Sequence, residues 1–61
     1  MKYSELKKML KKSGCYKVGE GAGHEHWHSP KTGKTFQVGR HKTQDVAPGT
    51  LGRILKDSGL R

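Results

Sequence analysis

The sequence predicts a two-layer α+β fold in the order α-β-β-β-α, with two helices on one face of an antiparallel three-stranded sheet. Three observations lead to this prediction. Apolar residues recur at helical spacing near both ends of the chain, and short alternating runs separated by glycine and proline lie between them. The length of 61 residues leaves room for one small domain, which we expect to span residues 1–61.

A first helix is expected near the N-terminus, where apolar side chains recur at spacings of three and four and lysines fill the opposite side. The apolar stripe consists of Tyr3, Leu6, Met9 and Leu10. Ser4 is expected near the N-cap, because its hydroxyl can accept a hydrogen bond from a free backbone N–H. Gly14 is expected to end the helix, since glycine readily adopts the left-handed conformation that follows a last turn.

Three short strands are expected in the middle of the chain, where alternation with a period of two replaces the helical pattern. The first covers residues 15–18 and ends in a glycine-rich turn at residues 19–23. The second covers residues 24–28 and the third covers residues 34–38. The segment between these two strands, residues 29–33, contains proline and glycine and therefore predicts a hairpin.

The C-terminal part of the chain predicts a polar, basic loop over residues 39–46, followed by a second helix. Pro48 suits the first turn of that helix, because backbone N–H groups there have no partner within the helix and proline has no N–H. Gly59 is expected to end it. The apolar stripe of this helix consists of Leu51, Ile54 and Leu55.

The charge balance predicts a polyanionic partner. Lysine and arginine number 13 against 5 acidic residues, so the net charge is +8 with neutral histidines, which suits nucleic acid, an acidic protein or an anionic membrane. A single cysteine, Cys15, excludes an internal disulfide and a four-thiolate zinc site. No apolar run approaches the ~20 residues of a membrane span, and no signal peptide is recognisable. We therefore expect a soluble, cytoplasmic protein with no membrane partner.

Histidines are the residues best suited to chemistry in this chain, which contains His24, His26, His28 and His41. If residues 24–28 are extended, the first three of them share one face of the strand, and Glu25 and Trp27 lie on the other. Burial under a helix is the favoured role for Trp27, with base stacking as the alternative.

Three interpretations of these histidines remain open. A metal site is weakly supported, because one His-x-His-x-His run does not provide the geometry and orienting groups that zinc needs. Acid–base catalysis on RNA is the second: a histidine activates a ribose 2′-hydroxyl to attack its own 3′-phosphate, without metal or cofactor. An unreactive strand surface is the third, and it is our expectation for His26 and His28.

Three motifs follow one another along the chain. They are Gly21-Ala22-Gly23-His24-Glu25-His26-Trp27, Val38-Gly39-Arg40-His41 and the stretch Pro48-Gly49-Thr50-Leu51 that continues to Leu60. In this order and spacing they resemble the HicA family of toxins, over a region from about Lys2 to Leu60. The chain departs from the family pattern at Ala22-Gly23, where the family has Gly-Ser, and at Gly39, where it has proline.

The resemblance implies a ribonuclease toxin of a type II toxin–antitoxin pair, inhibited by a HicB-type antitoxin. It also implies a fold similar to a double-stranded-RNA-binding domain. The catalytic histidine of the family falls on His24, and its second recurring histidine falls on His41, for which an RNA-contact or structural role is expected.

The resulting hypothesis is a metal-independent endoribonuclease that cleaves mRNA, with His24 as general acid or base and no cofactor. The expected RNA contacts are Lys17, Arg40, His41, Lys42 and Arg53. The antitoxin is expected to be acidic and to cover His24, because the toxin is strongly basic. The alternative is a non-catalytic RNA-binding module with the same fold, which needs no histidine chemistry.

Overall fold

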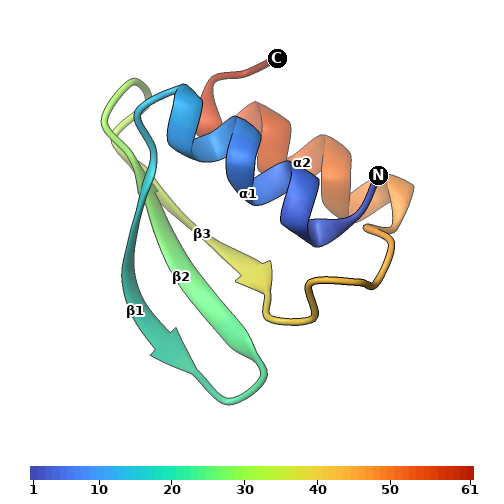
Figure 1. The fold of residues 1–61 in the computed structure, drawn as a ribbon. Coiled ribbons are helices and arrows are strands. Elements are labelled where there is room, and N and C mark those ends of the chain that lie inside the picture. The colour runs from blue at the N-terminus through green and yellow to red at the C-terminus, as the bar shows by residue number, and fades with distance from the viewer.

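The computed structural model describes residues 1–61, and its elements follow the predicted order (Figure 1). They are α1 (Tyr3–Lys12), β1 (Tyr16–Gly21), β2 (His24–Ser29), β3 (Lys34–Gly39) and α2 (Pro48–Ser58). The three strands form one antiparallel sheet in the order β1-β2-β3. The predicted α+β arrangement is thus confirmed. Neither helix has the length and apolarity required to cross a bilayer.

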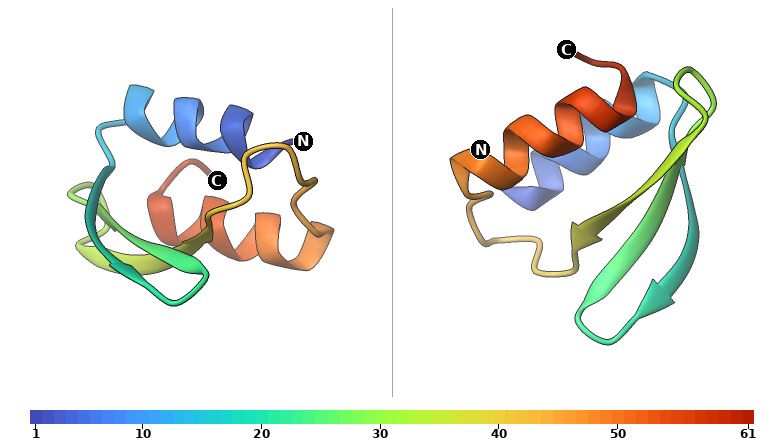
Figure 2. Two further views of the ribbon diagram at one scale, coloured as in Figure 1. Left: turned by 60° about the horizontal axis from the view of Figure 1, so that its bottom comes forward. Right: turned by 180° about the vertical axis from the view of Figure 1, so that it is seen from behind.

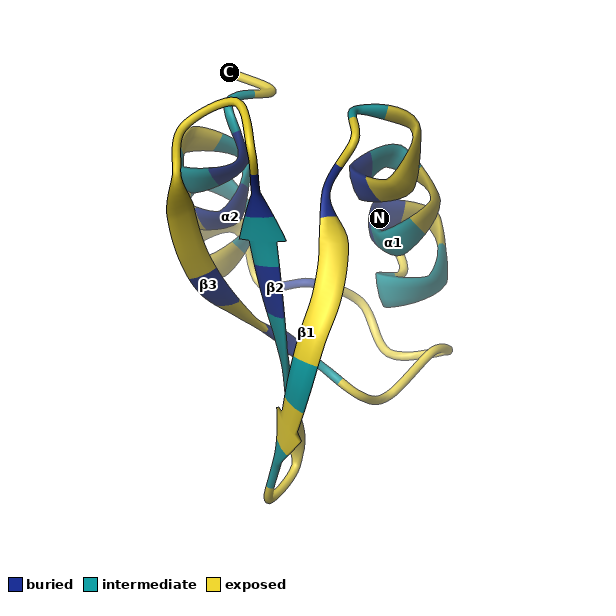
Figure 3. Ribbon diagram, turned by 90° about the vertical axis from the view of Figure 1, so that its left-hand side faces the viewer, coloured by how far each residue is buried: buried dark blue, intermediate teal, exposed yellow.

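Both helices lie on the same face of the sheet and run side by side in the same direction (Figures 1 and 2). Figure 3 shows α1 beside the edge strand β1 and α2 behind the other edge strand, β3. Trp27 pairs with Phe36 across β2 and β3, and both side chains are buried on the helix side. Alternation along β2 therefore directs His24, His26 and His28 to the face that no helix covers, as predicted.

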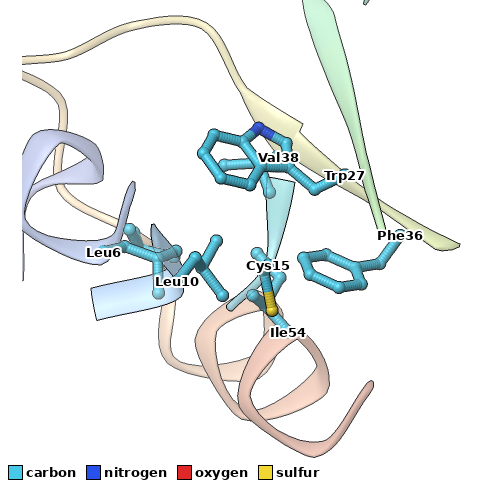
Figure 4. Close-up of a cluster of buried hydrophobic side chains, with 8 residues drawn as sticks. Leu6, Leu10, Cys15, Trp27, Phe36, Val38 and Ile54 are labelled. Carbon is cyan, nitrogen blue, oxygen red and sulfur yellow. The ribbon is translucent and has the colours of Figure 1, made fainter. Parts of the chain in front are cut away.

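The core lies between the helices and the sheet. Eight buried apolar residues form it, seven of them labelled in Figure 4: Leu6, Leu10, Cys15, Trp27, Phe36, Val38, Val46 and Ile54. Trp27 is 2% exposed, so the prediction of burial rather than base stacking is confirmed for this side chain. Cys15 is a small buried hydrophobic residue at 4% exposure, consistent with the usual environment of a free cysteine.

The start of α1 differs from the prediction. Lys2, and not Ser4, is the N-cap residue. Carbonyl groups of the distant loop satisfy the first free N–H groups of the helix: Tyr3 donates to the Gln44 oxygen at 3.1 Å, and Ser4 donates to the Lys42 oxygen at 3.2 Å. A serine cap is unnecessary where the loop provides acceptors, and this contact also fastens the loop to α1.

Strand β1 is longer than predicted, because it continues through Gly19 and Glu20 to Gly21. These residues pair with β2 after a register shift between Lys17 and Gly19, which marks a β-bulge at Val18. Backbone pairing with β2 thus overrides the turn preference of the two glycines, and the predicted five-residue turn contracts to Ala22 and Gly23.

The other helix ends agree with the prediction. Gly14 has a φ of 95° just after α1, which ends at Lys12. Helix α2 begins at Pro48, and Gly59 forms its C-cap in the left-handed conformation, with a φ of 83°. Ser29, at the end of β2, is fully buried and donates a 2.7 Å hydrogen bond to the Ser58 carbonyl, which ties the sheet to the last turn of α2.

Candidate functional site

His24 is the first residue of β2 and directly follows the turn that joins it to β1. Its side chain is exposed on the open face of the sheet. Its two cross-strand neighbours are both glycines, Gly21 on β1 and Gly39 on β3. Neither paired residue therefore adds a side chain beside the imidazole; the His26 ring lies over Gly21 and the Tyr3 ring lies against Gly39.

The turn before His24 also orients its ring. Nδ1 of His24 lies 3.1 Å from the carbonyl oxygen of Ala22. A carbonyl can only accept a hydrogen bond, so this contact holds the proton on Nδ1 and leaves the lone pair of Nε2 exposed in the neutral ring. Gly23 makes the turn possible with a φ of 76°, a conformation in which serine would be strained.

An open groove of about 840 Å³ extends from His24 along β3 and α2. It contains three of the residues predicted to act on RNA, namely His24, His41 and Arg53, and also His26. The only lining residues with a full formal charge are Arg53 and Asp57, so the groove has almost no net charge when its histidines are neutral. The sequence-predicted base and a cationic group thus share one concave surface.

The loop that carries His41 is fixed beside this groove. Its carbonyls accept hydrogen bonds from the first turn of α1, and Val46 donates to the Met1 carbonyl at 2.8 Å. At the end of β3 the Tyr3 ring lies against Gly39, where an added Cβ would be only 2.9 Å from Cζ of Tyr3. The absence of a side chain at Gly39 therefore allows the Tyr3 ring to pack closely against the end of β3.

The remaining predicted RNA contacts lie elsewhere. Lys17 and Lys42 line a second, smaller depression of about 310 Å³ between α1 and β1, together with Lys7 and Lys11. We call this depression the lysine hollow. Arg40 lines neither depression; its charge acts on Glu20, whose pKa is lowered by the hydrogen bond from Lys17 and then by the positive charges of Lys17 and Arg40.

Sequence reasoning missed the role of Glu25, which lies on the helix side of β2. Its carboxylate accepts hydrogen bonds from the Trp27 indole at 3.0 Å and from Lys7 at 3.1 Å. Burial raises the pKa of Glu25, but these two bonds and the charges of Lys7 and Lys17 outweigh it and lower the pKa overall. Strand alternation, which directs Glu25 toward the core beside Trp27, was a signal that this carboxylate needs a cationic partner.

The other two strand histidines have local packing roles. Nδ1 of His28 lies 3.3 Å from the Thr35 hydroxyl, and its ring centroid lies 5.5 Å from that of Tyr16. The His26 ring covers Gly21, with Nε2 3.2 Å from where a Cβ would be. No group of three histidine, cysteine, aspartate or glutamate side chains is close enough together to hold a metal ion.

Fold and site together describe a small basic α+β protein with two exposed histidines, His24 and His41, in an open, mostly polar groove. Comparison with protein families is consistent with this description: the family model described as HicA toxin of bacterial toxin-antitoxin matches residues 3–60. The chain therefore belongs to the HicA toxin family, and it is the toxin of a toxin–antitoxin system with an antitoxin as its partner. No curated protein and no solved structure matched the chain, so the likeness to double-stranded-RNA-binding domains stays a prediction.

Proposed function

We propose that this toxin is a metal-independent endoribonuclease that cleaves mRNA, with His24 as the general acid or base. The observation that supports it best is the environment of His24. Its ring is exposed between two glycines, and the Ala22 carbonyl holds the proton on Nδ1. Nε2 is then free to accept a proton from a substrate, which is what a general base requires.

The reaction needs only groups that the chain and the RNA provide. Nε2 of His24 takes the proton of a ribose 2′-hydroxyl, and the 2′-oxygen forms a bond to the adjacent phosphorus. The bond from phosphorus to the 5′-oxygen breaks, and that oxygen takes a proton from the imidazolium or from water. The products are a 2′,3′-cyclic phosphate and a free 5′-hydroxyl, with no metal or cofactor in any step.

Two groups in the groove are suited to hold the reacting phosphate. The Arg53 guanidinium makes no ion pair with an acidic residue and lines the groove with His24, so its charge is available to a phosphate. His41 lines the same groove and is proposed to contact RNA. Lys17, Arg40 and Lys42 are proposed to contact the RNA outside it.

A non-catalytic RNA-binding module of the same fold is the second candidate function. The +8 net charge supports it, because attraction to RNA requires no histidine chemistry. His24→Ala separates the two candidates. For a ribonuclease the variant binds single-stranded RNA like the wild-type protein but cleaves it at least about a hundredfold more slowly.

The matched control for this experiment is His28→Ala, which removes an imidazole from the same face of the same strand without touching the groove. It should cleave at the wild-type rate. Equal cleavage by the wild-type protein and His24→Ala would contradict the catalytic assignment. Binding without cleavage by either protein would support the binding module.

The antitoxin partner is proposed to be an acidic, HicB-type protein that covers the His24 groove in the cytoplasm. The basic surface of the toxin favours an acidic partner, and occupation of the groove would exclude RNA from His24. The single domain of residues 1–61 would then carry both the catalytic groove and the surface that the antitoxin recognises.

A further inference from the structure

We infer that the lysine hollow is a binding site for backbone phosphates of single-stranded RNA, separate from the His24 groove. This inference rests on the proposed function, since it takes RNA as the ligand. The hollow lies between α1 and β1, and its basic lining residues come from three parts of the chain: Lys7 and Lys11 of α1, Lys17 of β1 and Lys42 of the loop.

The charge of the hollow is its most informative property. Four lysines and a single acidic residue, Glu25, line it, which leaves three positive charges around a depression of about 310 Å³. Lys7 is largely buried, with 13% of its side chain exposed, and its ammonium is occupied by Glu25. Lys11 and Lys42 are exposed and make no ion pair, so two ammonium groups are free to bind an anion.

The contrast with the His24 groove shows why such a site would matter. Arg53 is the only lysine or arginine that lines that groove, whereas four lysines line the hollow, so the groove offers less attraction to a polyanion. Phosphate contacts provide most of the sequence-independent affinity for nucleic acid. The groove can therefore carry the chemistry while the hollow provides the affinity.

An RNA strand suits the hollow better than an extended peptide does. The neighbouring strand β1 is an edge strand, the usual place for a peptide to add a strand. The β-bulge at Val18 and the charged Lys17 disrupt that edge, and both features oppose strand addition. Tyr16 also lines the hollow, but its ring lies near that of His28, so the affinity of the hollow depends on its lysines.

The positions of the two depressions predict a dependence on RNA length. The hollow adjoins edge strand β1 and the groove adjoins edge strand β3, and the two come together at the loop, where Lys42 lines the hollow and His41 lines the groove. The molecule measures 26 × 23 × 19 Å. An RNA strand that contacts both depressions must therefore span several nucleotides. Shorter RNAs can occupy only one of the two sites.

The test measures RNA affinity in the His24→Ala background, which prevents cleavage during the titration. Fluorescence anisotropy compares single-stranded RNAs of about 4 and about 15 nucleotides over a range of salt concentrations. For the longer RNA, adding Lys11→Gln and Lys42→Gln should weaken binding and reduce the slope of log K against log salt by about 1.4, or ~0.7 per lost phosphate contact. The shorter RNA should bind the parent protein more weakly than the longer one, and the same two substitutions should weaken its binding too, because the hollow is its main site.

The matched control adds Lys8→Gln and Lys56→Gln, which remove the same charge from two exposed lysines outside both depressions. Its slope should stay close to that of the parent protein. An unchanged slope in the hollow variant, or an equal loss in the control, would overturn the proposal. So would binding of polyglutamate that depends on Lys11 and Lys42 while RNA binding does not.

Failure of the proposed function is visible separately in the cleavage activity of the wild-type protein. RNA binding that depends on Lys11 and Lys42, without cleavage by the wild-type protein, would support the phosphate site and contradict the ribonuclease.

Discussion

Lys7 of α1 and Glu25 of β2 form an ion pair of 3.1 Å, and only 13% and 14% of their side chains are exposed. The other oxygen of Glu25 accepts the indole N–H of Trp27, the largest buried side chain of the core. One carboxylate thus connects the first helix to the sheet and also satisfies the tryptophan. Because Glu25 directly follows His24, this interaction also fixes the strand that presents the candidate base.

Glu25→Gln should lower the free energy of unfolding by about 1.5 to 3 kcal/mol, the usual range for a hydrogen bond to a charged group. The amide oxygen can still accept from Trp27, but the Lys7 ammonium loses its anionic partner in a largely buried position. Urea unfolding followed by Trp27 fluorescence measures the difference. Glu20→Gln is the control: its pair with Lys17 is exposed, so it should change the free energy of unfolding much less than Glu25→Gln does.

The lowered pKa of Glu25 predicts an acid-side loss of stability. Because the carboxyl binds its proton more weakly in the folded protein, its contribution is complete above the ordinary value of 4.5 and is lost as the pH falls through the folded-state pKa. Unfolding measured from neutral pH downward should show this decline in the wild-type protein and a flatter profile in Glu25→Gln. Identical profiles for the two proteins would contradict a role for this carboxylate.

Ser29→Ala should destabilise the protein by about 1 to 2 kcal/mol, because it removes a buried donor and leaves the Ser58 carbonyl without it. The bond joins the end of β2 to the last turn of α2, so its loss should also loosen the position of that helix over β3. Thermal unfolding compares the variant with Thr43→Ala, which alters an exposed loop hydroxyl. Equal melting temperatures for the two variants would show that the buried bond contributes nothing.

Binding of the antitoxin should weaken as salt increases, because an acidic partner on this basic surface gains affinity from opposite charges that salt screens. Titration of the toxin with its purified antitoxin at low and high salt measures the effect. Arg53→Gln should reduce the salt dependence if the antitoxin occupies the His24 groove. Affinity that stays constant across the salt range would contradict an electrostatic partner.

Most of the fold could be predicted because local patterns determine it. Three of the signals depend only on residues close together in the sequence. They are the apolar stripes of both helices, Pro48 at the start of α2 and the alternation through Trp27. The predictions were wrong where contacts between distant segments of the chain determine the structure. Loop carbonyls accept the hydrogen bonds from the first turn of α1, where a cap by Ser4 was expected. Pairing with β2 extends β1 through Gly19, where a turn was expected.

The candidate site could be predicted only in part, for the same reason. His24 is identified by its motif, and the glycine spacing around it is visible in the sequence. Lys17 and Arg53 were both predicted to contact RNA on the basis of their charge, yet they line different depressions. That separation depends on the strand order and on the path of the loop that carries Lys42, and neither is encoded by residue spacing.

The most direct test of the central claim is to identify the ends of RNA fragments released by the wild-type protein and by His24→Ala, in EDTA, from one defined single-stranded RNA. If His24 is the acid–base group, the wild-type protein should leave 2′,3′-cyclic phosphate ends and His24→Ala should release no fragments. No cut should occur where a 2′-deoxynucleotide replaces the nucleotide before the scissile phosphate. Equal cleavage by both proteins, or cleavage that EDTA abolishes, would contradict His24 as the metal-independent acid–base group.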